Sequence, residues 1–477
     1  MLDRQVKVYA PAARHGFARH HRPVRTLVRA ELSPTAERAS VKRVAYCTFG
    51  CRLNQCDTAA IRTLLERERG YETVDPRERA DIYVVNTCTV TARADTSARK
   101  TIRRLHGERP EARIVVVGCY AQRAPHELAA LPGVSLVVGA AERAQIGDEL
   151  RRLASHRQRV RVSPISEAKF FLELPIEAMA QRSRAFVKIQ EGCNRSCSFC
   201  IIPQTRGGSR SRRPEGILHE VQRLVGQGYP EIVLTGVHLG DYGLDLDYRE
   251  PLLVPLLADI LAIPGEFRVR LSSIEPTSVS DALIELVAAE PRFARHFHIP
   301  VQSTAATVLK RMQRGYTAGE FTDLVQRIAA KIPNCGIGTD VICGFPGETE
   351  AHFHETLECL GTLPITYIHA FPYSLRPGSK AEPYGDAIAP SEKKRRVHAL
   401  QRLSRSKSQA FREAQIGQVV AVLFESATSK AQGVSTGWSD NYVRVRLSAG
   451  AAMGLRQVRI QRLTQEGCLG ELAVSAT

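Results

Sequence analysis

Apolar and polar positions along residues 43–152 alternate between two patterns. Runs of consecutive apolar residues, typical of buried strands, are followed by polar stretches in which apolar residues recur at helical spacing. The expected strands and helices, in chain order, are Val44–Thr48, Thr58–Arg69, Asp81–Asn86, Ala92–Leu105 and Arg113–Val117. Because strands that alternate with helices form parallel sheets, we expect an α/β domain built on a parallel sheet.

The same alternation returns from Ala185 to about Pro383. The expected strands are Phe186–Gln190, Glu231–Thr235, Arg268–Ser272, His296–Pro300, Gly336–Ile342 and Ile365–Phe371. Helices are expected between them, as at Gly216–Gln227 and Thr349–Gly361. Six strand and helix units predict a partial or full parallel (β/α) barrel, whose functional sites lie at the carboxyl ends of the strands.

The pattern changes again near the C-terminus. Residues 391–415 hold eight Lys or Arg against two acids, and four apolar residues form a stripe at helical spacing: Val397, Leu400, Leu403 and Phe411. This stretch predicts a basic amphipathic helix packed on the barrel. Short alternating strands follow, including Val419–Phe424 and Tyr442–Leu447, and they predict a small all-β barrel.

These patterns divide the 477 residues into about three domains, as expected for domains of about 100 to 200 residues. Residues 1–43 hold ten Lys or Arg against three acids and have no apolar run that resembles a signal peptide. The expected organisation is a basic, disordered arm at 1–40, an α/β domain at 41–152, a linker at 153–178, a barrel domain at 179–411 and a β domain at 412–477.

The net charge of the chain indicates what kind of partner it binds. The net charge of +17 favours a polyanion, because basic side chains that neutralise phosphates release counterions, and nucleic acid is the first candidate. A generally basic proteome is the alternative explanation. The most apolar run, Pro251–Pro264, is shorter than the roughly 20 residues of a membrane span. We therefore expect a cytoplasmic protein without a membrane partner.

Three of the twelve cysteines directly follow expected strands of the first domain: Cys51, Cys88 and Cys119. Ligands bind at the carboxyl edge of open parallel sheets, so three thiols at that edge predict a metal site with three protein ligands. The alternative is that small buried cysteines merely pack at strand ends. Cys47 and Cys56 flank the first position, and either is an alternative to Cys51.

A second set of thiols lies just after the first expected strand of the barrel. The segment Q-E-G-C-N-R-S-C-S-F-C places Cys193, Cys197 and Cys200 in a C-x3-C-x2-C pattern. Three thiolates can hold three irons of a cubane and leave the fourth iron open for S-adenosylmethionine (SAM). Phe199 is placed to pack on the adenine ring. Zinc is the alternative, but its structural sites use four ligands, and no fourth Cys or His follows at the usual spacing.

The motifs as a set resemble the methylthiotransferase family of the radical SAM superfamily. They are T-F-G-C-R-L-N-Q, N-T-C-T-V, V-V-G-C-Y-A-Q, Q-E-G-C-N-R-S-C-S-F-C-I-I-P with R-G-G-S-R-S-R, L-T-G-V-H-L-G-D-Y-G, H-I-P-V-Q-S and G-F-P-G-E-T. The resemblance covers residues 41–477. It implies two 4Fe–4S clusters, one on Cys193, Cys197 and Cys200 as the catalytic centre and an auxiliary one on Cys51, Cys88 and Cys119. It also implies two SAM molecules, one as methyl donor and one as radical source.

The resemblance further implies SAM contacts at the strand ends of the barrel. Besides Phe199, these are Thr235, Gly236, Ser273, Gln302 and Asp340. A glycine after a strand can instead serve a tight turn, and Ser273 or Gln302 can instead satisfy neighbouring backbone groups.

The acceptors known for this family are an isopentenyl or threonylcarbamoyl adenosine beside the tRNA anticodon and an aspartate of a ribosomal protein. The strings C-R-L-N-Q, H-A-F-P-Y-S-L-R-P-G-S and V-L-F-E look most like the threonylcarbamoyladenosine branch. A non-catalytic RNA-binding iron–sulfur redox sensor is the alternative of another class.

The last 60 or so residues are similar to a TRAM domain, which grips RNA. Its expected RNA contacts are Tyr442, Arg444, Arg446, Arg456, Arg459 and Arg462, although each arginine is alternatively a solvated surface charge. The expected partners are tRNA at the anticodon loop, an electron donor such as flavodoxin or ferredoxin, and a sulfur source.

Overall fold

The computed structural model describes residues 41–473 except for position 69 and the segments 154–157, 178–182, 247–249, 426–434 and 448–452. The arm predicted at residues 1–40 lies outside the described residues. Val41–Thr477 forms one unit by its internal contacts, so the elements below belong to the same body.

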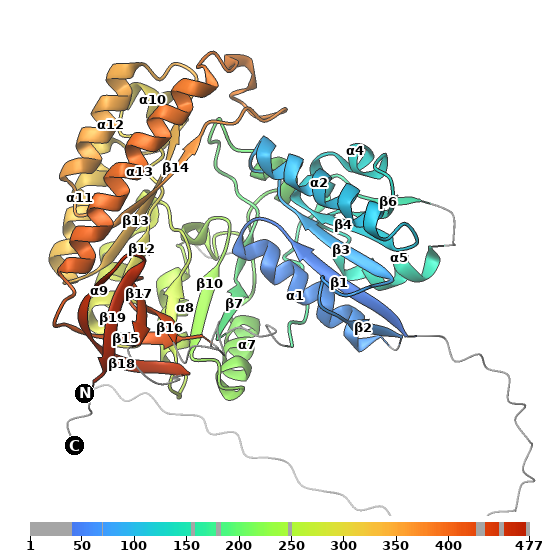
Figure 1. Cartoon of the computed structure of the whole chain (residues 1–477), viewed down its shortest axis with the longest axis horizontal. Helices are drawn as coiled ribbons and strands as arrows, with labels where there is room; N and C mark the ends of the chain where they lie inside the picture. The colour runs from blue at the N-terminus through green and yellow to red at the C-terminus, as the bar shows by residue number, and fades with distance from the viewer. Residues whose placement is uncertain are drawn as a thin grey trace, which may run out of the picture. The chain divides into compact units, whose positions relative to one another are not determined.

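A six-stranded parallel sheet is the framework of the first region (Figure 1). Its order is β2-β1-β3-β4-β5-β6. The strands are β1 (Lys42–Thr48), β2 (Tyr71–Thr73), β3 (Ile82–Thr87), β4 (Arg113–Gly118), β5 (Val134–Val138) and β6 (Arg159–Arg161). The α/β class and the three expected strands are confirmed, and three further strands extend the sheet. Strand β6 lies within the stretch predicted as a linker, because three residues at a sheet edge are too short to give a recognisable pattern.

Helices cover both faces of this sheet. They are α1 (Arg52–Arg67), α2 (Ala92–Glu108), α3 (Cys119–Arg123), α4 (Pro125–Ala129) and α5 (Ile146–Arg152). Helix α1 begins at Arg52 and not at the expected Thr58. Its first turns are polar and so lack apolar periodicity, yet Asn54 and Asp57 are buried there against polar partners.

Six parallel strands of the second region form a partial barrel. They are β7 (Arg184–Lys188), β10 (Glu231–Thr235), β11 (Arg268–Leu271), β12 (His296–His298), β13 (Gly336–Cys343) and β14 (Tyr367–Pro372). They form two sheets, β11-β10-β7 and β12-β13-β14, and a parallel bridge between Val269 and Phe293 connects them. Among the described residues β7 and β14 do not pair, so the barrel is open there. A small hairpin of β8 (Gln190–Glu191) and β9 (Arg210–Ser211) flanks the first strand.

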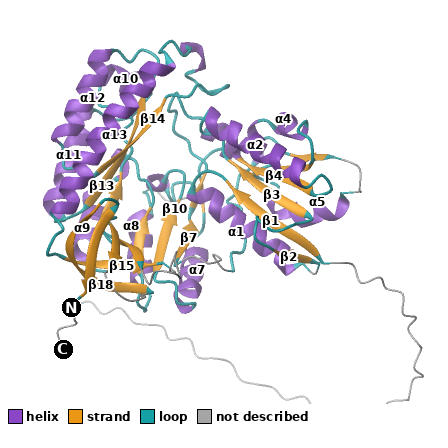
Figure 2. Cartoon of the chain, viewed as in Figure 1, coloured by secondary structure: helices purple, strands orange, loops and turns teal. Residues whose placement is uncertain are grey.

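Helices surround the partial barrel (Figure 2). They are α6 (Ile202–Arg206), α7 (Pro214–Gly226), α8 (Leu253–Ala262), α9 (Asp281–Ala289), α10 (Ala306–Arg311), α11 (Ala318–Lys331), α12 (Glu350–Thr362) and α13 (Pro390–Glu413). Short 3-10 turns are η1 (Arg143–Gln145), η2 (Ile165–Glu167), η3 (Leu239–Asp241), η4 (Pro276–Ser278) and η5 (Glu382–Tyr384).

Helix α13 is the basic amphipathic helix expected from the sequence. Val397 and Leu400 belong to the core of the barrel, and Leu403 packs against that core. Phe411, near the end of the helix, packs instead against the core of the C-terminal barrel. One helix therefore contributes to two hydrophobic cores.

The C-terminal region is a closed barrel of short strands in the order β15-β16-β17-β19-β18. The strands are β15 (Val419–Phe424), β16 (Thr436–Ser439), β17 (Arg444–Leu447), β18 (Gly454–Thr464) and β19 (Gly467–Leu472). This barrel contacts the amino ends of the α/β strands: Arg268 at the start of β11 donates to the carbonyl of Ala421 at 2.8 Å. The expected small all-β barrel is confirmed.

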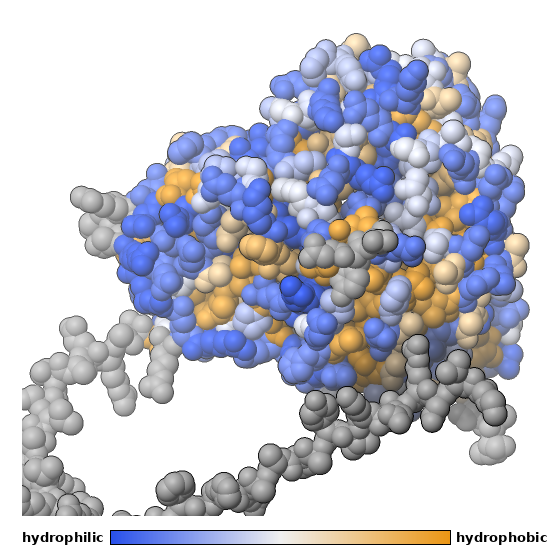
Figure 3. All heavy atoms as spheres, turned by 180° about the vertical axis from the view of Figure 1, so that it is seen from behind, coloured by the Kyte–Doolittle hydropathy of each residue, from blue (hydrophilic) through white to orange (hydrophobic). Residues whose placement is uncertain are grey.

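The surface is predominantly polar but not uniformly so. Seen from behind, apolar side chains gather across the middle of the face and polar ones lie along its edges (Figure 3). None of the helices formed by the described residues has the length and apolarity needed to cross a membrane.

Candidate active site

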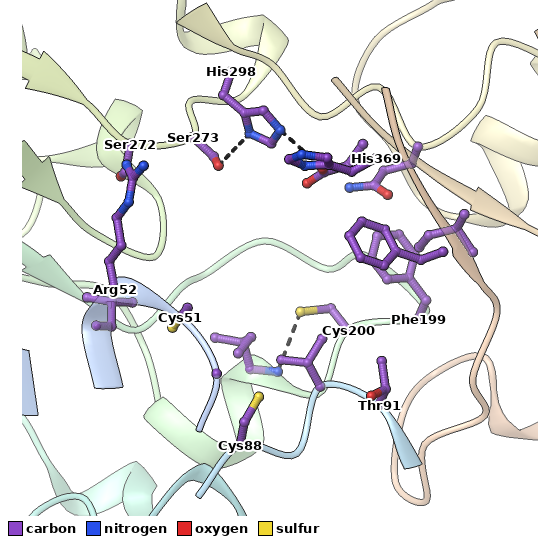
Figure 4. Close-up of a pocket in the computed structure, with 18 of the residues that line it drawn as sticks. Cys51, Arg52, Cys88, Thr91, Phe199, Cys200, Ser272, Ser273, His298 and His369 are labelled. Atoms are coloured by element: carbon purple, nitrogen blue, oxygen red, sulfur yellow. Dashed lines mark hydrogen bonds and ion pairs between the residues drawn. The ribbon is translucent and has the colours of Figure 1, made fainter. Parts of the chain in front are cut away.

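A cavity of about 760 Å³ lies where loops of the first sheet meet the partial barrel and the C-terminal barrel. This volume is in the range of pockets that hold small molecules and cofactors. Among its lining residues are most of the candidates selected from the sequence: Cys51, Cys88, Phe199, Cys200, Thr235, Gly236, Ser273, Gln302 and Asp340. Figure 4 shows the thiols of Cys51, Cys88 and Cys200 on one side of this cavity, and Ser273, His298 and His369 on another.

The loop after β7 and β8 carries Cys193, Cys197 and Cys200. Each sulfur lies near an N–H donor: backbone N–H of Arg195 for Cys193 (3.3 Å), the Arg314 guanidinium for Cys197 (3.1 Å) and backbone N–H of Ile202 for Cys200 (3.5 Å). Such donors stabilise the charged form of a thiol. Burial nevertheless raises the pKa of Cys193 to about 11 and that of Cys200 to about 12.

A glycine fixes the start of this loop. Gly192 has a φ of +75°, and a Cβ atom there would lie 1.8 Å from the carbonyl oxygen of Gly208. Any other residue would clash with the backbone. The close approach of the two chain segments therefore depends on glycine at this position.

Cys51, Cys88 and Cys119 follow β1, β3 and β4, which are neighbours in the sheet. The loop before Cys51 passes close to Cys88, because a Cβ on Gly50 would lie 2.7 Å from the Cβ of Cys88. Burial and the neighbouring Cys119 together raise the pKa of Cys88 to about 12. The three strand ends thus bring these cysteines to one edge, as the sequence predicts.

Cys47 and Cys56 have other surroundings. Cys47 packs against the apolar cluster on one face of the sheet. Cys56 is buried in α1, where its thiol lies 3.6 Å from the carbonyl of Phe186 and lines a separate small pocket. Cys51, by contrast, lines the main cavity together with Cys88, and the adjacent Gly50 lies against Cys88. The structure therefore favours Cys51 over Cys47 and Cys56 as the first member of this group.

Arg206 connects the two cysteine groups. It ends α6, just after Cys200, and its Nε lies 3.3 Å from the sulfur of Cys119. Its Nη2 donates to Asn54 at 2.5 Å, and Asn54 in turn donates to the carbonyls of Phe49 and Thr87, which flank the cysteine loops. A residue of the barrel domain therefore helps to position the loops of the first domain.

Two buried carboxylates neutralise Arg206. Asp57 accepts from Arg206 at 3.0 Å and pairs with Lys188 at 2.8 Å, while Glu191 accepts from Arg206 at 2.6 Å. Arg143 pairs with both carboxylates. Burial opposes ionisation, but these cations lower the pKa of Asp57 and of Glu191. The sequence pattern does not predict this network, because Asp57, Arg143 and Arg206 are far apart along the chain.

In neither cysteine group do the three sulfurs all lie within 4.8 Å of one another. Among the described residues, only His298, Asp340 and His369 bring three ligand atoms within 4.8 Å of one another. Zinc draws its ligands around one ion, whereas each thiolate of a cubane binds a different iron. A cubane, whose thiolates bind different irons, accommodates sulfurs that do not converge on one ion.

Asp340 lies between two histidines on the cavity wall. Its carboxylate lies 3.1 Å from Nε2 of His298 and 3.2 Å from Nδ1 of His369, and Ser273 bonds to the other nitrogen of His298 at 2.7 Å. Burial would raise the pKa of Asp340, but the two histidine contacts lower it to about 2. Ser273 and Asp340 are among the residues predicted from the sequence, whereas the two histidines are not.

The remaining SAM candidates lie on the same wall. Gly236 follows β10. A Cβ atom at this position would lie 2.8 Å from the Leu239 side chain, so packing favours glycine here. Gln302 has a φ of +67°, and its backbone N–H donates to the carbonyl of Asp340 at 2.8 Å. Phe199 packs beside a small apolar cluster.

Aromatic rings close the end of the cavity opposite the strand ends. Tyr442, from the turn between β16 and β17, lies 4.6 Å from His296 and 5.7 Å from Tyr367, measured between ring centroids. His296 and Tyr367 are the first residues of β12 and β14, so they mark the amino ends of parallel strands. We call this end the floor. Tyr442, which is expected to contact RNA, lines the cavity.

Comparisons with known proteins agree with this architecture. A family model described as Radical SAM superfamily matches residues 187–360, and one described as Uncharacterized protein family UPF0004 matches residues 43–139. The radical S-adenosylmethionine methyltransferase TsrM from Kitasatospora setae, with cobalamin and a [4Fe-4S] cluster bound, has a similar fold. Its TM-score is 0.54 at 17% identity, over 72% of this chain and 77% of that one.

Relatives in sequence are more similar. The threonylcarbamoyladenosine tRNA methylthiotransferase MtaB of Bacillus subtilis is 40% identical over 84% of this chain and 89% of that protein. MtaB of Thermotoga maritima is 35% identical over 90% and 96%. The tRNA-2-methylthio-N(6)-dimethylallyladenosine synthase of Pelotomaculum thermopropionicum is 33% identical over 82% and 89%.

Proposed function

The chain belongs to the radical SAM tRNA methylthiotransferases, and from this premise we propose that it methylthiolates C2 of N6-threonylcarbamoyladenosine at position 37 of tRNA. Relatives named for threonylcarbamoyladenosine share 33–40% identity with it, and two of them share 40%. Relatives named for dimethylallyladenosine share 33–34%. This difference supports the threonylcarbamoyl acceptor over the isopentenyl one.

Enzymes of this family use SAM and 4Fe–4S clusters. We propose that Cys193, Cys197 and Cys200 hold the radical cluster and that Cys51, Cys88 and Cys119 hold the auxiliary one. The observation that supports this most is that Cys51, Cys88 and Cys200 line one cavity. When bound, the clusters and SAM supply one-electron chemistry together with the sulfur and methyl groups.

The side chains of the cavity bind and orient. Asp340 is ionised at neutral pH because its pKa is about 2, so it can accept hydrogen bonds from SAM while the two histidines hold it in place. Thr235, Gly236, Ser273 and Gln302 shape the same wall. The aromatic floor closes the cavity on the side of the C-terminal barrel and excludes water there. An electron donor such as flavodoxin or ferredoxin and a sulfur source complete the proposal.

Cluster content tests the ligand assignment. Anaerobically purified wild type should hold about eight irons, and a variant with Cys193, Cys197 and Cys200 replaced by alanine about four. Replacing Cys51, Cys88 and Cys119 should likewise leave about four. Replacing Cys47 and Cys56 by serine should leave all eight. A loss of iron from this last variant would contradict the choice of Cys51.

The acceptor is tested in cells. Nucleoside mass spectrometry of tRNA from a strain lacking the gene should show loss of the methylthio derivative of threonylcarbamoyladenosine and no other change. Loss of the isopentenyl derivative, or of a modified ribosomal-protein aspartate, would replace the acceptor. Formation of 5′-deoxyadenosine by the reduced, reconstituted protein separates the enzyme from a redox sensor, which would form none.

A further inference from the structure

A cluster of arginines lies beside the floor of the cavity. Arg184, Arg268 and Arg270 all pair with one carboxylate, Glu231, at 2.8 Å, 2.6 Å and 3.3 Å. Glu231 is fully buried and begins β10. Among the described residues, Arg184 also pairs with Glu425 at 3.4 Å, and Asp440 interacts electrostatically with Arg268. The nearby carboxylates are therefore already engaged by these three arginines.

Arg52 adds a fourth cation, and this one lines the cavity. Its guanidinium lies over the Phe186 ring, 5.8 Å from the centroid, and its main electrostatic neighbours are Tyr442, Arg270 and Glu231. Throughout the described part of the chain, no carboxylate forms an ion pair with Arg52 and no oxygen accepts a hydrogen bond from its side chain. Figure 4 shows the side chain running away from the thiols of Cys51 and Cys200 toward Ser272.

Two polar atoms of β11, or of the residue directly after its carboxyl end, are among those that lack hydrogen-bond partners within the described structure. They are the hydroxyl oxygen of Ser272 and Nη1 of Arg270, both buried. Ser272 also lines the cavity. A buried donor without an acceptor is costly, and an arginine fork matches the two oxygens of a carboxylate. Arg52 and Ser272 together therefore form a site suited to a bound carboxylate.

The geometry of adenine allows the carboxylate of the acceptor to reach this site. C2 and C6 both flank N1 in the six-membered ring, so the bonds to their substituents diverge. When C2 faces the cysteines at the strand ends, the bond to N6 is directed away from them, which leaves the N6 substituent free to extend toward Arg52. The threonylcarbamoyl group carries a carboxylate there, whereas a dimethylallyl group carries no charge.

We propose that Arg52, assisted by Ser272, binds the carboxylate of the threonylcarbamoyl group and makes the enzyme specific for an acidic N6 substituent. The proposal rests on the function proposed above. SAM also carries a carboxylate, but the residues proposed to contact it lie on the wall around Asp340. Arg52 is thus a specificity-determining residue, and binding of SAM by Arg52 is the alternative that the experiment must separate.

The test compares two anticodon stem-loop RNAs, one with threonylcarbamoyladenosine and one in which the threonyl carboxylate is replaced by a carboxamide. Wild type should prefer the acid by about 10- to 100-fold in kcat/KM, the range expected when a charged hydrogen bond is lost. Arg52→Gln should abolish this preference, and Arg52→Lys should retain part of it. Arg67→Gln removes an exposed arginine at the other end of α1 and should keep the preference of wild type.

Each outcome has a distinct meaning. An acid preference that survives in Arg52→Gln would overturn the proposal while leaving the proposed function intact. A fall in RNA-independent cleavage of SAM to 5′-deoxyadenosine, at unchanged iron content, would assign Arg52 to SAM instead. A wild type that modifies an isopentenyladenosine stem-loop and neither test RNA would overturn the proposed function itself.

Discussion

The twelve cysteines of this chain fall into two groups, six candidate cluster ligands and six that pack elsewhere in the fold. Six end strands or lie on the loop after β7, and three of these, Cys51, Cys88 and Cys200, line one cavity. The other six pack in hydrophobic surroundings or in helices: Cys47, Cys56, Cys335, Cys343, Cys359 and Cys468. The sequence distinguishes the candidate ligands by their position, because a cysteine that follows a predicted strand is expected at the edge of the sheet. The number of cysteines alone does not make this distinction.

Arg206 should influence the auxiliary cluster through Cys119. Arg206→Gln removes the N–H donor 3.3 Å from this sulfur and leaves Asp57 and Glu191 with one cation fewer. We expect the reduction potential of the auxiliary cluster to fall, because a cation near the ligand stabilises the added electron. We also expect a loss of about 3–5 kcal/mol in the free energy of unfolding, because a buried ion network is broken.

Redox titration followed by electron paramagnetic resonance measures this effect. The potential of the radical cluster serves as an internal control and should stay unchanged. Arg104→Gln, which breaks an exposed ion pair with Glu108, should change neither potential and should cost at most about 1 kcal/mol. An unchanged auxiliary potential in Arg206→Gln would contradict the role given to this residue.

At the scale of elements, both ends of the parallel strands carry function. The carboxyl ends hold the cysteine loops, as expected for parallel sheets. The amino ends of β7, β10 and β11 hold the arginines that share Glu231, and the C-terminal barrel covers them. The sequence predicts the first arrangement but not the second, because the pairing of distant charges depends on strand order in space.

Glu231 should stabilise the protein in a pH-dependent manner. Burial opposes its ionisation, but Arg268, Arg270 and Arg184 lower its pKa below the usual value of a glutamate. A carboxyl whose folded pKa is depressed contributes its full stabilisation above its unfolded pKa, about 4.3, and loses it as the pH falls toward the folded value. Glu231→Gln should therefore cost about 3–5 kcal/mol at neutral pH, and this difference should shrink below about pH 4.

Urea denaturation across a pH series measures the difference. Glu108→Gln, on the surface of α2, provides the matched control and should cost under about 1 kcal/mol at every pH. A cost for Glu231→Gln that is equally small, or that grows as the pH falls, would refute the assignment.

At the scale of the whole molecule, both the net charge and the exposed arginines of the C-terminal barrel are expected to favour binding of tRNA. The net charge of +17 is expected to attract the phosphates of tRNA over long distances. Of the arginines expected to contact RNA, Arg444 pairs with Glu466, so its charge is partly neutralised. Arg456 and Arg462 are exposed on β18 and remain the stronger candidates.

Replacing Arg456 and Arg462 by glutamine should weaken tRNA binding most at low salt. Each lost phosphate contact should reduce the slope of log affinity against log salt by about 0.7 to 0.9, so the double variant should lose about 1.4 to 1.8. Equilibrium binding at several salt concentrations gives the slope. Arg79→Gln, exposed in the first domain, should leave it unchanged. An unchanged slope in the double variant would place the RNA elsewhere.

Local patterns along the chain predict the order of the three regions, most strands and the two groups of three cysteines. These follow from local periodicity and from the position of a thiol after a strand, and both depend on neighbouring residues. Contacts between distant side chains depend instead on how the chain folds: Arg206 with Cys119, the two histidines with Asp340, and Arg52 with the floor that Tyr442 closes. Each of these contacts joins residues far apart in the chain, so their geometry depends on how the sheet, the partial barrel and the C-terminal barrel pack together.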